Sequence, residues 1–450
     1  MSFLGRQSVI AALTANAVRP PRGRRSGLWG FFAGAPVNEL APQLLAATAL
    51  DAAVQVARGR RSSRRARAGL ALAGASALGL ARIVRQSQQA SSRLEDALVE
   101  GLGVDYVEQL DQAPSPADLA TPWRRLARPF ALRDPEVRVI SDLSYSEAGK
   151  RGRLDLYLPA GVDTIADAPV LVQVHGGAWS VGEKEHQGRP LMNRMAAKGW
   201  VCVAINYRLA PRDAWPAQVV DVKRALAWVK EHIAEHGGNP DYVVVTGGSA
   251  GGHLAALAAL TPGDPAFQPG FEEADTSVQA AVPFYGVYDF AGSTGLANAI
   301  GMRDAFLGPR VMQTSWDEAP DAYEAASPIL RVTPGAPDFF VIHGEHDSLV
   351  AVDQARLFVE ELRRTSRRSV VYAELPGAQH AFDVFHSIRS NHAVLAVDRY
   401  LTWHWNTWRH GLAADSGVDP EDLGADTPED VPDVADRASA DDAADRSARA

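Results

Sequence analysis

Hydrophobic and polar positions divide the 450-residue chain into an Ala- and Leu-rich N-terminal region, a long alternating middle part and a polar tail. From residue 134 onward, runs of β-branched and apolar residues, typical of strands buried on both faces, alternate with segments of helical spacing. Strands are expected at 137–145, 153–158, 170–174, 200–205, 242–246, 278–285, 338–343 and 369–375, and helices at 217–236, 253–260, 353–364 and 390–405. This alternation predicts an α/β fold, a mostly parallel sheet with helices on both faces, in which residues 287–336 form an insertion.

Two Ala- and Leu-rich segments near the N-terminus, 40–57 and 68–84, are joined by an Arg-rich link at 58–67 and predict a helical hairpin. The uncharged stretch 68–81 is shorter than the roughly twenty residues that a bilayer span needs. Asp51 interrupts the first segment, and an acid at mid-bilayer is costly. We therefore expect these helices to pack on the protein body as a cap, and interfacial contact with anionic lipid through the link is the alternative.

Charge is spread unevenly over the chain, whose net charge is -9. Residues 1–90 hold thirteen arginines and two acidic residues, whereas residues 411–450 hold twelve acidic residues and three arginines. We expect three parts: a basic N-terminal region (1–134), a catalytic domain (135–410) and an acidic tail (411–450) that is disordered because it has little apolar surface to bury. The acidic middle part argues against a nucleic-acid partner, which would need a basic groove.

The strongest chemical signal is the turn Gly247–Gly252, which places Ser249 in the pattern G-x-S-x-G between an expected strand and an expected helix. In this context a serine lies on a sharp turn with its Oγ exposed. We expect Ser249 to be a nucleophile. The backbone N–H of Ala250 would then point at the oxygen that becomes negative when a carbonyl is attacked.

A second glycine-rich loop, His175-Gly176-Gly177-Ala178-Trp179, directly follows the expected strand 170–174. Consecutive glycines let backbone N–H groups converge on an anion without interference from Cβ atoms. We expect Gly176 and Gly177 to supply the remaining donors of an oxyanion hole. His175 is expected to brace this loop, and Trp179 either walls a substrate pocket or packs in the core.

A nucleophilic serine needs a base, and the base needs a group that orients it. Asp347 and His380 each follow an expected strand, and they come after Ser249 in the chain order serine, acid, histidine. We expect Asp347 to orient His380 and His380 to act as the general base. Glu345 and Asp383 are the alternatives for the orienting acid.

These motifs, together with Asn206–Pro211, a helix from Asp221 to His232 and the loops that carry Asp347 and His380, resemble those of the α/β-hydrolase esterases of the hormone-sensitive-lipase-like group. Within that group the chain looks most like the actinobacterial, mycobacterial-type Lip carboxylesterases, over about residues 135–405. The group usually reads HGGG, whereas this chain has Ala178 in place of the third glycine, followed by Trp179. The pattern HGGxW also occurs in arylformamidase-like and bifunctional feruloyl/acetyl esterase-like hydrolases, so the difference bears on the substrate class.

The resemblance implies a serine hydrolase that cleaves carboxylic esters of short to medium acyl chains without a cofactor. An arylformamidase-like or deacetylase-type amide or ester hydrolase, and an inactive hydrolase-fold binding protein, are the alternatives. The single cysteine, Cys202, excludes an intramolecular disulfide and a cysteine-based zinc site, and we expect no metal. The expected partner is a small-molecule or lipid ester, with peripheral membrane contact through the N-terminal region left open. The apolar stretch 9–13 is short for a signal peptide, so the sequence does not decide between the cytoplasm and the membrane or cell envelope.

Overall fold

The computed structural model describes residues 1–416 except 22–23, 60–61 and 163. The chain divides into two compact units, Met1–Thr402 and Trp403–Ala450, and the sheet and the candidate site both belong to the first unit. The expectation of a disordered tail falls, from residue 417 on, outside the described residues.

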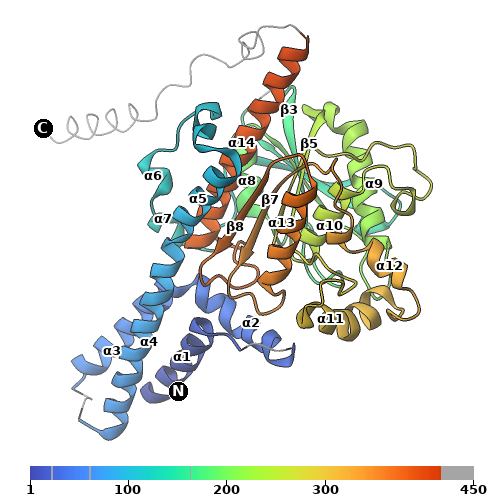
Figure 1. The fold of residues 1–450 in the computed structure, drawn as a ribbon. Coiled ribbons are helices and arrows are strands. Elements are labelled where there is room, and N and C mark those ends of the chain that lie inside the picture. The colour runs from blue at the N-terminus through green and yellow to red at the C-terminus, as the bar shows by residue number, and fades with distance from the viewer. Residues whose placement is uncertain (22–23, 60–61, 163, 417–450) are drawn as a thin grey trace, which may run out of the picture. The chain divides into compact units, whose positions relative to one another are not determined.

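Eight strands form one sheet in the order β1-β2-β4-β3-β5-β6-β7-β8 (Figure 1). The strand β2 runs antiparallel to its neighbours β1 and β4, and the other neighbouring pairs are parallel. The strands are β1 (Val137–Ser144), β2 (Arg153–Pro159), β3 (Ala168–Val174), β4 (Val201–Ile205), β5 (Gly238–Gly248), β6 (Ala280–Phe284), β7 (Asp338–Gly344) and β8 (Val370–Leu375). Every expected strand is present, and the predicted α/β class with a mostly parallel sheet is confirmed.

The central strands are buried on both faces because helices cover the sheet from both sides (Figure 1). One layer is formed by α9 (Ala217–His232), α10 (Ala250–Leu260) and α13 (Val352–Thr365), which pack on β5 to β8. The helix α8 (Arg189–Ala197) packs on β2 and β4, and it is joined to α14 (Ile388–Ser416) by an ion pair between Arg194 and Asp398. The 310-helix η3 (Ile233–His236) ends the expected helix 217–236 at Gly237, whose φ of 84° lies in the left-handed region.

The expected insertion lies between β6 and β7 and is largely helical. It contains α11 (Ala297–Met302), the π-helix η5 (Arg303–Met312), α12 (Pro320–Ala325) and the 310-helix η6 (Pro328–Leu330). The remaining short elements are η1 (Val104–Gln109), α6 (Pro116–Leu119), α7 (Trp123–Leu126), η2 (Gly149–Gly152) and η4 (Pro265–Phe267).

The N-terminal region forms five longer helices rather than the single hairpin that was expected. They are α1 (Phe3–Val18), α2 (Arg24–Glu39), α3 (Ala41–Ala57), α4 (Arg64–Gln88) and α5 (Ala90–Leu102). The hairpin itself is present as α3 and α4, whereas α1 and α2 were not predicted because their Arg, Gly and Pro residues conceal the apolar spacing. Ala17, Val37, Ala41, Leu80 and Ile83 form a small core of their own between these helices.

The N-terminal helices are joined to the catalytic part by buried polar contacts. Glu39, at the end of α2, forms an ion pair of 3.0 Å with Arg389 of α14, and both side chains are almost fully buried. Glu39 also accepts a hydrogen bond of 2.6 Å from the hydroxyl of Ser387. The helix α5 packs along the edge strand β8, where Gly101 lies directly over Val371. These contacts place the helices on the protein body.

The helical stretch Arg64–Leu102, which comprises α4 and α5, is long and apolar enough by length and composition to cross a membrane. This differs from the sequence-based estimate, which counted only the uncharged stretch 68–81. In the structure, α4 packs against α1 and α3, and α5 packs against β8, so both helices have protein contacts that a separate span would give up.

Candidate active site

Ser249 lies at the sharp turn between β5 and α10, as the G-x-S-x-G pattern predicts. Its backbone has φ 58° and ψ -121°, a conformation that is strained for a residue with a side chain. The turn is held by a hydrogen bond of 3.0 Å from the N–H of Ser249 to the carbonyl oxygen of Phe284. The start of α10 directly after the serine places unpaired helix N–H groups beside its Oγ.

Two glycines let the chain close up around this turn. A Cβ atom at Gly247 would lie 2.6 Å from the carbonyl oxygen of Gly251. A Cβ atom at Gly251 would overlap the carbonyl oxygen of Val174, the last residue of β3. Larger residues at either position would push α10 away from the sheet and displace Ser249, which explains the glycines in the pattern.

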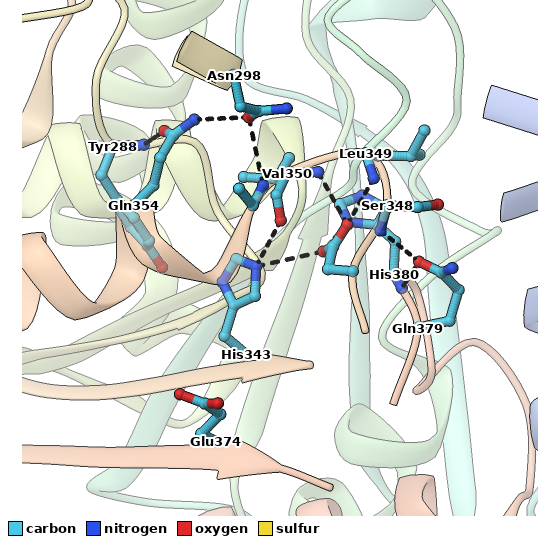
Figure 2. Close-up of polar contacts among 12 residues, drawn as sticks. Tyr288, Asn298, His343, Ser348, Leu349, Val350, Gln354, Glu374, Gln379 and His380 are labelled. Carbon is cyan, nitrogen blue, oxygen red and sulfur yellow. Dashed lines mark hydrogen bonds and ion pairs between the residues drawn. The ribbon is translucent and has the colours of Figure 1, made fainter. Parts of the chain in front are cut away.

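His380 and Asp347 lie on two loops at the same end of the sheet and form a short hydrogen bond. His380 Nδ1 lies 2.6 Å from Asp347 Oδ2, and both side chains are buried. The other carboxylate oxygen, Oδ1, accepts hydrogen bonds from the N–H groups of Leu349 and Val350 at 2.9 and 2.8 Å (Figure 2). Two backbone N–H groups of the acid loop thus fix the carboxylate that faces the imidazole.

His343 is a second partner of the same carboxylate, and the sequence did not single it out for this role. Its Nε2 lies 3.3 Å from Asp347 Oδ2 and 3.0 Å from the carbonyl oxygen of Val350 (Figure 2). Burial alone would raise the pKa of Asp347, but the charge of His380 and the hydrogen bond from His343 outweigh it and hold this pKa well below its ordinary value. Asp347 is therefore ionised at neutral pH.

The two alternative acids have other partners. Glu345 accepts a hydrogen bond of 2.8 Å from the N–H of Gly377, so it binds the backbone of the histidine loop. Asp383 accepts a hydrogen bond from the hydroxyl of Tyr285, and its burial raises its pKa above the ordinary value. Gln379 joins the two loops, because its Oε1 accepts hydrogen bonds from the N–H groups of Ser348 and His380.

One expected oxyanion donor is already engaged. The N–H of Gly176 donates a hydrogen bond of 2.7 Å to Oε1 of Gln187, so in this structure it is not available to an oxyanion, contrary to expectation. The N–H groups of Gly177, Ala178 and Ala250 donate no hydrogen bond to another of the described residues. Ala178, with a φ of 52°, lines the cavity beside Ser249. The N–H groups of Gly177, Ala178 and Ala250 thus remain as candidate oxyanion donors around Ser249.

His175 and Trp179 hold this glycine loop in place. The ring of His175 stacks on Tyr207 with centroids 4.3 Å apart, and its Nδ1 lies 2.7 Å from the carbonyl oxygen of Gly176. The indole N–H of Trp179 donates to Nδ1 of His253 at 3.1 Å, and Trp179 also lines the cavity. Both of the roles that the sequence left open for Trp179 are therefore present, since its ring packs in an aromatic cluster and borders the pocket.

A cavity of about 1030 Å³ lies over these residues. Ser249 and His380 line it on one side, and Met302 and Phe306 from the insertion line it on another. Leu28 from α2 completes part of the wall. Within the described part of the chain, no group of three or more His, Cys, Asp or Glu side chains is arranged to hold a metal ion.

The fold and this site define an α/β-hydrolase, and comparison with known proteins agrees. The BD-FAE family model matches residues 154–362. The probable carboxylic ester hydrolase LipM of Mycobacterium tuberculosis is 46% identical over 417 residues, which cover 90% of this chain and 93% of LipM. The esterase LipQ of the same organism is 45% identical, covering 70% of this chain and 75% of LipQ.

The chain belongs to the family of these mycobacterial Lip proteins, which are carboxylic ester hydrolases. An alignment that covers 90% of the chain necessarily extends well into residues 1–134, so the similarity to LipM includes much of the N-terminal region. Among solved structures, esterase B from Lactobacillus rhamnosis (HN001) has a TM-score of 0.51 and is 19% identical, covering 74% of this chain and 99% of that one. This likeness supports the fold.

Proposed function

We propose that this protein is a serine carboxylesterase in which Ser249, His380 and Asp347 form the catalytic triad. The observation that carries the proposal is the 2.6 Å contact between His380 Nδ1 and Asp347 Oδ2 next to a cavity that Ser249 and His380 both line. With Nδ1 donating to the carboxylate, Nε2 of His380 is the acceptor for the proton of the serine hydroxyl.

In the proposed reaction, Ser249 Oγ attacks the ester carbonyl while His380 Nε2 takes its proton. The N–H groups of Gly177, Ala178 and Ala250 hold the oxyanion of the tetrahedral intermediate, so that Ala178 takes the place of Gly176 in the set Gly176, Gly177 and Ala250 expected from the sequence. His380 then protonates the leaving alcohol, which leaves an acyl-enzyme. Water repeats the sequence in reverse, so that the carboxylic acid is released and the serine is restored.

The cavity is large enough for esters whose acyl chains are longer than acetyl. Its volume of about 1030 Å³ is at the upper end of the range of small-molecule sites. Apolar side chains, including Leu28, Met302 and Phe306, form much of its wall. Short to medium acyl groups would find apolar surface there, while the ester carbonyl lies at Ser249.

Replacing the nucleophile tests the proposal. Ser249→Ala should lower kcat/KM for p-nitrophenyl butyrate by roughly four orders of magnitude, because the triad acts as a unit. His380→Ala should lose about as much, and Asp347→Ala somewhat less. Ser92→Ala, an exposed serine on α5, is the matched control and should leave the rate unchanged.

A fluorophosphonate probe identifies the reactive serine independently of the substrate. The probe should form its adduct on Ser249, and an adduct on another serine would refute the assignment. The same preparation, assayed with N-formylkynurenine beside a series of p-nitrophenyl esters, tests the formamidase alternative. A strong preference for the formamide would overturn the carboxylesterase proposal while leaving the triad in place.

A further inference from the structure

Over residues 27–34, the helix α2 has its glycines inside and its large apolar residues Leu28, Trp29 and Phe32 outside, the reverse of an ordinary surface helix. Gly27, Gly30 and Gly34 are buried, at a spacing that puts them on one face. On the other face, Leu28, Trp29 and Phe32 are 50%, 76% and 63% exposed. These three residues are called the outer face of α2 below.

The inner glycines bring the backbone of α2 unusually close to the catalytic loops. A Cβ atom at Gly27 would collide with the carbonyl oxygen of Ser348, whose hydroxyl donates a hydrogen bond of 2.9 Å to the carbonyl oxygen of Gly27. Gly34 packs closely on Asn16 of α1, and a Cβ atom there would also be in ordinary contact, at 3.9 Å, with Nε2 of Gln379 on the histidine loop. The backbone of α2 is therefore fixed to the acid loop at Ser348, while Leu28, Trp29 and Phe32 point outward.

The outer face lies at the mouth of the cavity. Leu28 belongs both to the outer face and to the cavity wall. Phe31, one residue before the exposed Phe32, meets the ring of His380 edge-on with centroids 5.8 Å apart. In Figure 1, α2 lies beside the end of the sheet where the loops after β7 and β8 emerge. Whatever covers the outer face of α2 is thus next to the entrance of the site.

The surrounding charge favours an anionic occupant. In the sequence, four arginines fall within residues 19–25, immediately before or at the start of α2. The acidic tail would match this charge, but residues 411–450 contain no aromatic and few large aliphatic residues that could cover a tryptophan and a phenylalanine. A bilayer of anionic lipid offers both negative charge and apolar surface.

We propose that the outer face of α2 docks the protein on the surface of an anionic lipid bilayer, with Trp29 and Phe32 inserted between the lipids. The mouth of the cavity then opens toward the bilayer, so that esters dissolved in the lipid reach Ser249 past Leu28. Docking itself is independent of the chemistry, and only the entry of lipid esters from the bilayer rests on the proposed function.

Co-sedimentation of the full-length protein with vesicles tests the docking surface. Vesicles of equal parts phosphatidylglycerol and phosphatidylcholine should bind the protein, and binding should weaken as salt rises because exposed charges are screened. The double variant Trp29→Ser with Phe32→Ser should bind at least about tenfold more weakly, since two large apolar side chains no longer leave water. Both side chains are exposed, so the fold does not depend on them.

Trp123→Ser is the matched control, because Trp123 is an exposed tryptophan (55%) on the separate helix α7, and its binding should equal that of the wild type. Unchanged turnover of a soluble ester by the double variant reports an intact site. The proposal would be overturned if the wild type did not bind the vesicles, or if the double variant bound them equally well. It would also be overturned if the wild type self-associated and the double variant did not. Vesicle binding by Ser249→Ala separates the two proposals, since docking persists in that variant whether or not Ser249 is the nucleophile.

Discussion

At the scale of single residues, two buried histidines form a neutral scaffold under the glycine loop. His253 accepts the indole N–H of Trp179 at Nδ1, so its Nε2 carries the proton that is donated to the carbonyl oxygen of Ala326 at 2.8 Å. Burial lowers the pKa of His253 to about 3 and that of His175 to about 4. Both rings are therefore neutral in the folded protein at neutral pH.

These two pKa values predict how stability depends on pH. Below the ordinary pKa of 6.5 the unfolded chain binds protons at His175 and His253 while the folded protein does not, so protons favour unfolding. Keeping these two histidines neutral therefore stabilises the folded protein relative to acid conditions. This stabilisation is fully present above pH 6.5, and it is lost as the pH falls toward about 4 for His175 and about 3 for His253. At most, this stabilisation is on the order of 3 kcal/mol for His175 and 5 kcal/mol for His253.

Urea denaturation at a series of pH values from 7 down to 4 measures how steeply the free energy of unfolding falls with pH. His253→Phe should be less stable at pH 7, because the partners of the ring are left unsatisfied, but its stability should fall less steeply with acid. The test is the pH dependence of the free energy of unfolding, not its value at pH 7. An unchanged pH dependence in His253→Phe would show that this histidine is protonated in the folded state.

The residues proposed for chemistry were found from the sequence because each follows a recognisable strand. Ser249, Asp347 and His380 come at strand ends, and parallel strands bring such ends to one edge of a sheet. The engagement of Gly176 could not be predicted, since it depends on the side chain of Gln187, which the fold brings back to the loop. His343 was also missed, because a histidine inside a strand shows no sign in the sequence of the carboxylate it meets.

At the scale of elements, α2 shows why the N-terminal region was harder to predict than the sheet. The strands of the sheet have continuous apolar runs, which hydrophobic patterns detect directly. Over residues 27–34 of α2 the buried positions are glycines, and the large apolar residues Leu28, Trp29 and Phe32 are exposed. A pattern that expects large residues inside therefore assigns no helix there, although two Ala- and Leu-rich segments further on were recognised as α3 and α4.

Because Leu28 forms part of the cavity wall, α2 should affect acyl-chain preference. Leu28→Ala should lower kcat/KM for p-nitrophenyl octanoate by about threefold to tenfold, since lost methylene contacts in an apolar pocket have effects of this size. The loss for the acetate ester should be smaller, because a short acyl chain does not reach this wall. Leu50→Ala, also exposed but outside the cavity lining, is the control. Equal losses for both esters would contradict a role of α2 in acyl selection.

At the scale of the whole first unit, the buried pair Glu39–Arg389 fixes the N-terminal helices to the catalytic part. Removing one partner leaves an uncompensated buried charge, so Glu39→Ala should lower the free energy of unfolding by about 3–5 kcal/mol. Glu374→Ala breaks the more exposed pair with Arg356 and should cost about 1 kcal/mol or less. Urea denaturation compares the two variants directly, and similar losses would show that the buried pair is not what holds the regions together.

This pair also limits what a truncation can reveal. Deleting residues 1–90 removes Glu39 and uncovers Arg389, whose guanidinium also donates to the carbonyl oxygen of Pro376 at the start of the histidine loop. A change in acyl-chain preference after such a deletion could arise from loss of the N-terminal helices beside the cavity or from disturbance of the loop that carries His380. Single substitutions on α2 separate the two effects, because they leave Glu39 in place.

The separation of Glu39 and Arg389 along the chain has a consequence for synthesis. Glu39 leaves the ribosome 350 residues ahead of its partner, which at about 5–20 residues per second is a delay of roughly 20–70 s. During that interval the carboxylate can remain hydrated, but its burial beside the histidine loop has to wait for Arg389. The N-terminal helices are thus made before the sheet but reach their final place only after Arg389 has been made, and the nascent chain carries no complete site until His380 has left the ribosome.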